Sequence, residues 1–178
     1  MMPDHNIVDQ LSIAYKTEIS GYFFYNTAAI MVGDDKGKNI FSHLAKEELD
    51  HIRVISRIAD SVKNGMGWIG YEEALREGVA SQKGLPIFQG ENDLIKRLEK
   101  NQTDVNAVAI AIENEESAVD FYSRLLKEAK TPVEKVVLTN FLEMEKGHLK
   151  ILRWEAESLG KTGFWCGDME YSVEKERE

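Results

Sequence analysis

The stretch "AKEELDHIRVI", residues 45–55, carries a glutamate and a histidine three positions apart, Glu48 and His51. Apolar residues around them recur at spacings of three and four, which predicts a helix. Residues three apart share a helix face, so the two side chains can offer one ion an oxygen and a nitrogen together. Such a pair is also common on solvated helices, and Glu47, four positions before His51, is a competing carboxylate. Whether Glu48 and His51 are metal ligands or solvated residues depends on what the rest of the chain places near them.

The same pattern returns 97 residues later in "FLEMEKGHLKI", residues 141–151, where Glu145 and His148 fall on Glu48 and His51. Glu47 falls on Met144, so the repetition favours Glu48 over Glu47 as a ligand. The same shift, without a gap, also relates the preceding segments: Ala14 falls on Ala111, Glu18 on Glu115, Gly21 on Ala118, Phe24 on Phe121 and Tyr25 on Tyr122.

Each half therefore contains a Glu followed 30 positions later by Glu-x-x-His. In the second half Glu113, Glu115 and Glu116 compete for the first position. Symmetry with Glu18, and the tyrosine seven residues on, favour Glu115. The sequence leaves open whether Glu113 or Glu116 binds as well.

The bulk composition indicates one globular domain. The chain has 178 residues, of which 43% are apolar and 30% are charged, which is ordinary for a soluble domain. Its net charge of −9 argues against a nucleic-acid partner. Cys166 is the only cysteine, which excludes a disulfide framework and fits a reducing, cytoplasmic location. The first residues do not resemble a signal peptide, and the most apolar stretch is too short and polar to span a membrane.

Four long segments have helical periodicity, which predicts an all-α domain over residues 1–178. The helices are expected at roughly 6–32, 35–63, 103–129 and 132–159, the last ending at Gly160. Thr131, Pro132 and Glu134 form a capping box with proline in the first turn, and Asp34 or Asp35 caps the second helix. Short turns predict two antiparallel hairpins, joined by a crossover over 64–102 that includes short helices in "YEEALREG" and "NDLIKRLEK". Residues 160–178 are expected to form a tail.

A bundle of this kind brings four carboxylates and two imidazoles into its core. Without cations such a cluster would be poorly solvated and would have to take up protons. Four carboxylates and two neutral imidazoles offset two divalent ions, and mixed oxygen and nitrogen ligands suit Fe or Mn. The predicted metal ligands are Glu18, Glu48, His51, Glu115, Glu145 and His148.

The chain resembles the rubrerythrin branch of the ferritin-like superfamily, restricted to the helical domain. "EISGYFFY" and "ENEESAVDFY" resemble its first and third helices, and "EELDH" and "MEKGH" its Glu-x-x-His helices. The resemblance covers nearly the whole chain, including "LPIF" in the crossover and "GFWCGDMEYSVE" in the tail. It implies a ferritin-like four-helix bundle that holds a di-iron centre.

The resemblance also implies roles and an activity. Glu48 and Glu145 would bridge the ions, Glu18 and Glu115 would be terminal ligands, and His51 and His148 would each bind one iron. Tyr25 and Tyr122 would donate hydrogen bonds to the carboxylates. The implied reaction is reduction of hydrogen peroxide, with ferroxidase activity on dioxygen as a neighbour, in a homodimer.

The sequence departs from the family pattern in two places. A single cysteine cannot form the four-cysteine iron domain of full rubrerythrins, so electrons would come from a separate donor such as a rubredoxin. Ala118 stands where the family often has a redox-dependent Glu ligand, which puts iron movement in doubt. Rival functions are manganese catalase-like disproportionation, iron binding or storage, and a purely structural bundle.

Overall fold

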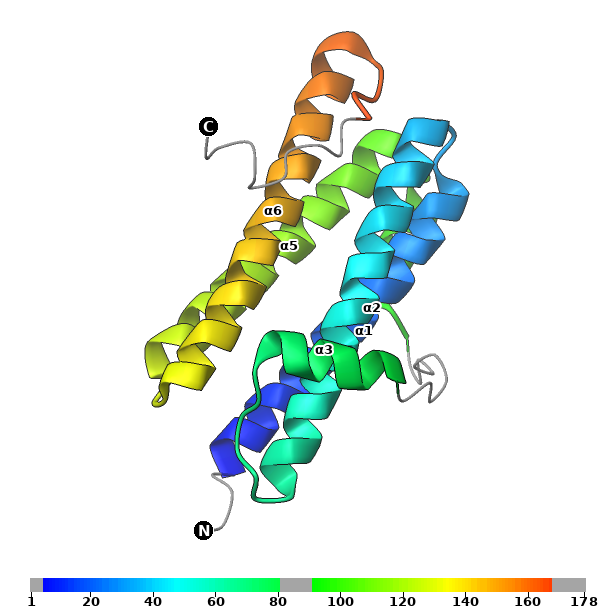
Figure 1. Ribbon diagram of the computed structural model, residues 1–178. Helices are drawn as coiled ribbons and strands as arrows, with labels where there is room; N and C mark the ends of the chain where they lie inside the picture. Colours follow the sequence, from blue (N-terminus) through cyan, green and yellow to red (C-terminus); the bar gives the residue numbers. More distant parts are fainter. Residues whose placement is uncertain (1–4, 81–90, 168–178) are drawn as a thin grey trace.

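The computed structural model describes residues 5–80 and 91–167, and all the regular structure in these ranges is helical (Figure 1). Two long hairpins lie side by side, one formed by α1 and α2 and the other by α5 and α6. The predicted all-α four-helix bundle is confirmed. The helices are α1 (His5–Met31), α2 (Asp35–Lys63), α3 (Tyr71–Ala80), α4 (Asp93–Lys100), α5 (Asp104–Glu128) and α6 (Pro132–Thr162).

The two hairpin turns are short because each following helix is capped at once. The Asp34 side chain accepts a hydrogen bond from the Lys36 N–H at 2.7 Å and caps α2. At the other turn Thr131 and Glu134 form the predicted capping box, with Pro132 in the first turn of α6. Turns this short leave each pair of helices antiparallel, as expected from the sequence.

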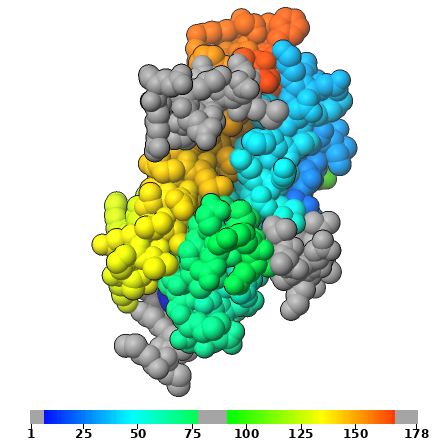
Figure 2. Space-filling model, viewed as in Figure 1, coloured from blue at the N-terminus to red at the C-terminus, as the bar shows by residue number. Residues whose placement is uncertain are grey.

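The crossover contains both short helices expected from the sequence, α3 and α4. Figure 2 shows that α3 lies against α2 and covers the surface where the lower part of α2 meets α6. The Tyr71 ring on α3 packs edge-on against Phe141 of α6, with ring centroids 5.3 Å apart. Asn92 caps α4 and also donates to the Ser20 carbonyl of α1 at 2.9 Å. The "LPIF" segment lies outside the described residues.

The predicted end of the last helix at Gly160 is wrong, because α6 continues to Thr162. Gly163, in the left-handed conformation with φ 77°, forms the C-cap. The reason is tertiary: the chain must turn here so that Trp165 reaches the core, where it is 3% exposed. The buried carboxylate of Glu155 then accepts the backbone N–H groups of residues 166 and 167 at 2.8 Å each. The part of the predicted tail beyond residue 167 lies outside the described residues.

Two apolar clusters form the core, one toward each end of the bundle. The first includes Phe24, Phe41 and Trp165, and the second includes Ile58, Tyr122 and Phe141. Between them the long helices contribute a layer of buried glutamates and histidines. Among the described residues no helix is long and apolar enough to cross a membrane.

Candidate metal centre

All six predicted ligand residues meet in the layer between the two apolar clusters. Each is at most 3% exposed. Glu18 lies in the middle of α1 and Glu115 in the middle of α5, while α2 and α6 each contribute a Glu-x-x-His pair. Burial of this kind is rare for carboxylates unless they are paired or bind a cation.

The six residues form two overlapping groups, each with ligand atoms within 4.8 Å of one another. Glu18 and His51 belong to the first group, and Glu115 and His148 belong to the second. Glu48 and Glu145 belong to both groups. The arrangement therefore offers two adjacent cation positions with a common pair of carboxylates.

Two tyrosines connect the hairpins through hydrogen bonds to Glu18 and Glu115. Tyr25 of α1 donates a hydrogen bond to Glu115 Oε1 of α5, and Tyr122 of α5 donates one to Glu18 Oε1 of α1. The second oxygen of each glutamate stays directed at the cluster: Glu115 Oε2 is 3.5 Å from His148 Nδ1, and Glu18 Oε2 is 3.4 Å from His51 Nδ1. Each tyrosine therefore fixes the orientation of a candidate ligand from the opposite hairpin.

Both imidazoles direct Nδ1 into the cluster. His51 Nδ1 is 3.1 Å from Glu145 Oε1, and His148 Nδ1 is 3.3 Å from Glu145 Oε2. The Nε2 atom of His148 is 2.7 Å from Glu47 Oε2. Glu47 belongs to neither group of candidate ligands. Its carboxylate contacts His148, the histidine of the other hairpin. The sequence presents Glu47 only as a rival of Glu48, because nothing local to α2 indicates a contact with α6.

Burial and mutual repulsion dominate the electrostatics of the carboxylates. Burial raises the pKa of Glu115 to about 8, with the charge of Glu145 adding to the effect. Burial also raises the pKa of Glu48, together with the charges of Glu18 and Glu145. Glu145 behaves oppositely: burial disfavours its charge, but His51 and His148 outweigh burial and lower its pKa. The same carboxylates raise the pKa of both histidines against the effect of burial.

The donor set fits a pair of cations. Within the described part of the chain, buried cluster atoms without any hydrogen-bond partner include both oxygens of Glu145, one oxygen each of Glu48 and Glu115, and Nδ1 of His148. Leaving a buried charged oxygen unpaired costs several kcal/mol, on the order of 2 or more per group. Divalent ions that accept oxygen and imidazole ligands would satisfy all of these atoms at once.

We expect the metal-free protein to lose stability as the pH rises from about 4.5 to about 8. Glu115 keeps its proton in the folded chain up to about 8 but in the unfolded chain only to its ordinary value of 4.5. Between these values the folded state binds more protons, so its free energy of unfolding falls with rising pH. The raised pKa values of the two histidines act in the same direction. The lowered pKa of Glu145 contributes only at acid pH.

Thermal unfolding followed by circular dichroism, with chelator present, measures this slope. Metal-loaded protein is the control, because bound ions replace the protons and should remove the decline. If the melting temperature of the metal-free protein rises between about pH 4.5 and about pH 8, the expectation is contradicted.

The rival acidic residues on α5 lie outside the cluster. Glu113 pairs with Arg97 at 2.6 Å and Glu116 pairs with Arg153 at 2.7 Å, both on the surface. His43 is also away from the cluster and lies 3.4 Å from Glu47. The structure thus places Glu115 alone of the three glutamates among the candidate ligands.

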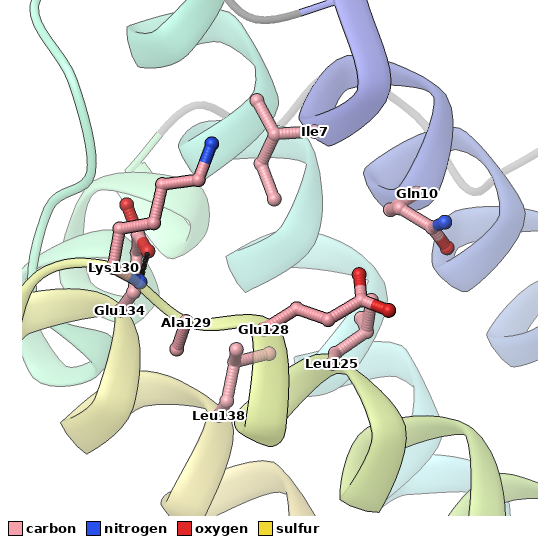
Figure 3. A pocket seen from close by; sticks show the side chains of 8 residues that line it. All are labelled: Ile7, Gln10, Leu125, Glu128, Ala129, Lys130, Glu134 and Leu138. Carbon is pink, nitrogen blue, oxygen red and sulfur yellow. Dashed lines mark hydrogen bonds between the residues drawn. The ribbon is translucent and has the colours of Figure 1, made fainter.

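A separate pocket of about 130 Å³ lies at the end of the bundle where α1 begins and the α5–α6 turn crosses (Figure 3). Ile7, Leu125 and Leu138 give it an apolar wall, and the Glu134 carboxylate beside it accepts the Lys130 N–H. None of the six candidate ligands lines this pocket.

Comparison with known proteins gives one result that bears on this site. A protein-family model described as Rubrerythrin matches residues 9–156, a range that includes all six candidate ligands. Neither the comparison with curated proteins nor that with solved structures returned a match.

Proposed function

Because the chain belongs to the rubrerythrin family, we propose that its buried cluster holds two iron ions and that the loaded protein reduces hydrogen peroxide. The observation that carries this proposal is the presence of Glu48 and Glu145 in both groups of candidate ligands. They would bridge the two ions. Glu18 and His51 would complete one position, and Glu115 and His148 the other. Family membership and the buried Glu/His cluster together support a di-iron carboxylate protein of the oxidoreductase type.

Reduction of hydrogen peroxide to two molecules of water consumes two electrons and two protons. A pair of ferrous ions, when bound, supplies one electron each. The protein would hold the carboxylates in place through Tyr25 and Tyr122, whose hydroxyls bond to Glu115 and Glu18. Burial, with the charge of the neighbouring glutamate, raises the pKa of both tyrosines, so they stay protonated donors at neutral pH. The apolar clusters on either side would keep bulk water away from the centre.

Electrons to restore the ferrous state would come from a separate protein, such as a rubredoxin. These 178 residues contain a single cysteine and cannot form a four-cysteine iron site. We also propose a cytoplasmic location, where this thiol stays reduced.

Anaerobic stopped-flow mixing of the diferrous protein with peroxide and, in parallel, with dioxygen tests the proposal. We expect peroxide to oxidise the iron much faster than dioxygen does. A preference for dioxygen would instead indicate ferroxidase chemistry. Tyr25→Phe should slow the peroxide reaction without unfolding the protein, since it removes only the hydroxyl that orients Glu115.

Manganese also fits the ligand chemistry, because carboxylate-rich sites suit Mn as well as Fe. A manganese centre would disproportionate peroxide without an electron donor. Metal analysis of protein produced with both metals available, followed by oxygen-evolution measurements, distinguishes the two. Active protein that is free of iron would refute the peroxidase proposal.

A further inference from the structure

The two candidate histidines differ on the side that faces away from the cluster. His148 Nε2 lies 2.7 Å from the Glu47 carboxylate. His51 Nε2 is equally buried but has no hydrogen-bond partner among the residues that the structure describes. The inner sides of the two rings are alike, since each Nδ1 lies within 3.3 Å of a Glu145 oxygen.

This difference originates in one position of the internal repeat. The residue equivalent to Glu47 in the second half is Met144, and a thioether is only a weak hydrogen-bond acceptor. His51 has an aromatic neighbour instead: its ring packs edge-on against Phe141, with ring centroids 5.2 Å apart, and Phe141 stacks on Tyr122. The repeat therefore supplies equivalent candidate ligands but only one outer carboxylate.

An outer carboxylate changes how well a histidine binds a metal. It fixes the tautomer in which Nε2 carries the proton and Nδ1 presents its lone pair, and it makes the ring a stronger donor. Losing such a partner typically weakens metal binding by about 10–100-fold. His51, if it binds through Nδ1, has no partner for its buried Nε2–H among the described residues, and an unpaired buried N–H is unfavourable.

Glu47 is well placed for this role. Its other oxygen, Oε1, lies 3.4 Å from His43 Nε2, so the carboxylate is held between two histidines. Its side chain is 34% exposed, so a substitution at this position does not open the core. Glu47 is thus a positioning residue that acts on the centre through His148.

From these observations we infer that Glu47 makes the two metal positions unequal, so that the position at His148 binds its ion more tightly and fills first. This inference rests on the proposed two-ion centre. The position at His51 fills second and releases its ion first. A duplicated sequence would then yield a centre whose two halves have different affinities.

Titration of the metal-free protein with Co²⁺, followed by visible absorption and calorimetry, tests the inference. We expect two steps whose dissociation constants differ by about 10–100-fold. Repulsion between two cations would separate the steps even in a symmetric centre, so the identity of the first position must be observed directly. With histidine labelled by nitrogen-15 and Zn²⁺ as a diamagnetic probe, the first equivalent should shift the ring signals of His148 before those of His51, although the two ring centroids are only 5.6 Å apart.

Four variants separate the effect of Glu47 from that of fold or charge. Glu47→Met should weaken the first step by about 10–100-fold, and Glu47→Gln, whose amide oxygen can still accept the Nε2–H, should weaken it less. Combining Glu47→Met with Met144→Glu should reverse the order, so that the His51 signals shift first. Glu143→Met is the matched control: it removes an exposed carboxylate, paired with Lys146 at 2.8 Å, and should change neither step.

Simultaneous shifts of both histidines in the unmodified protein, or a first step that Glu47→Met leaves unchanged, would overturn the inference while leaving the two-ion centre intact. Binding of fewer than two Co²⁺ per chain would refute the two-ion centre and the inference with it. The two failures are therefore distinguishable in one titration.

Discussion

Glu145→Ala is expected to reduce the bound metal from two ions per chain to one at most, and to abolish rapid oxidation by peroxide. Glu145 belongs to both groups of candidate ligands, and its two oxygens lie 3.1 Å from His51 Nδ1 and 3.3 Å from His148 Nδ1. No other carboxylate of the cluster approaches both imidazoles this closely. Its removal therefore takes a ligand from both positions at once, whereas loss of Glu18 or Glu115 would affect only one.

Elemental analysis after anaerobic loading with iron, combined with the stopped-flow assay, measures this effect. Glu116→Ala is the matched control, because this glutamate is on the surface in an ion pair with Arg153 and should retain both ions. Helical content from circular dichroism shows whether the variant still folds. A folded Glu145→Ala protein that keeps two ions with unchanged affinity would contradict the proposed bridging role.

Trp165→Ala should lower the free energy of unfolding by about 3–5 kcal/mol, the usual loss for removing a buried aromatic side chain. The Trp165 ring packs edge-on against Phe41 at 5.8 Å, and its Nε1 donates to Asp104 Oδ2 at 2.7 Å. It also lies so close to Gly37 that a Cβ at that position would be 2.5 Å from the ring. The Trp165 side chain therefore packs the segment after α6 against both α2 and α5.

Urea unfolding of the metal-free protein gives this value without the stabilisation that bound ions add. Trp154→Ala is the comparison: this ring is 45% exposed and should contribute much less, about 1 kcal/mol or below. Equal losses in the two variants would show that the packing of Trp165 does not hold the end of the bundle.

The internal repeat made most of the site predictable from the sequence. Register with the second half selected Glu48 over Glu47 and Glu115 over its neighbours, and the structure places the selected residues in one buried layer. Helix periodicity and caps are local properties, so the four long helices and their turns were also predictable. The predicted pairing of tyrosines with carboxylates is confirmed by the contacts of Tyr25 and Tyr122.

The errors and omissions concern contacts between segments that are distant in the chain. Gly160 looked like a helix end, yet α6 continues because Trp165 and the Glu155 carboxylate decide where the chain turns. Cys166 is half-buried, and its sulfur accepts a hydrogen bond from Trp154 Nε1 at 3.1 Å.

The sequence alone determined which residues are equivalent: two hairpins, each with a Glu and a Glu-x-x-His pair, directed at a common core. Only the tertiary structure decided which side chains of one hairpin contact the candidate ligands of the other. Hydrogen bonds between the hairpins depend on their relative placement and not on periodicity. Glu47 reaches His148 across the bundle while Met144 occupies the equivalent position. The duplication therefore specifies a symmetric set of candidate ligands, and packing between the hairpins makes their surroundings unequal.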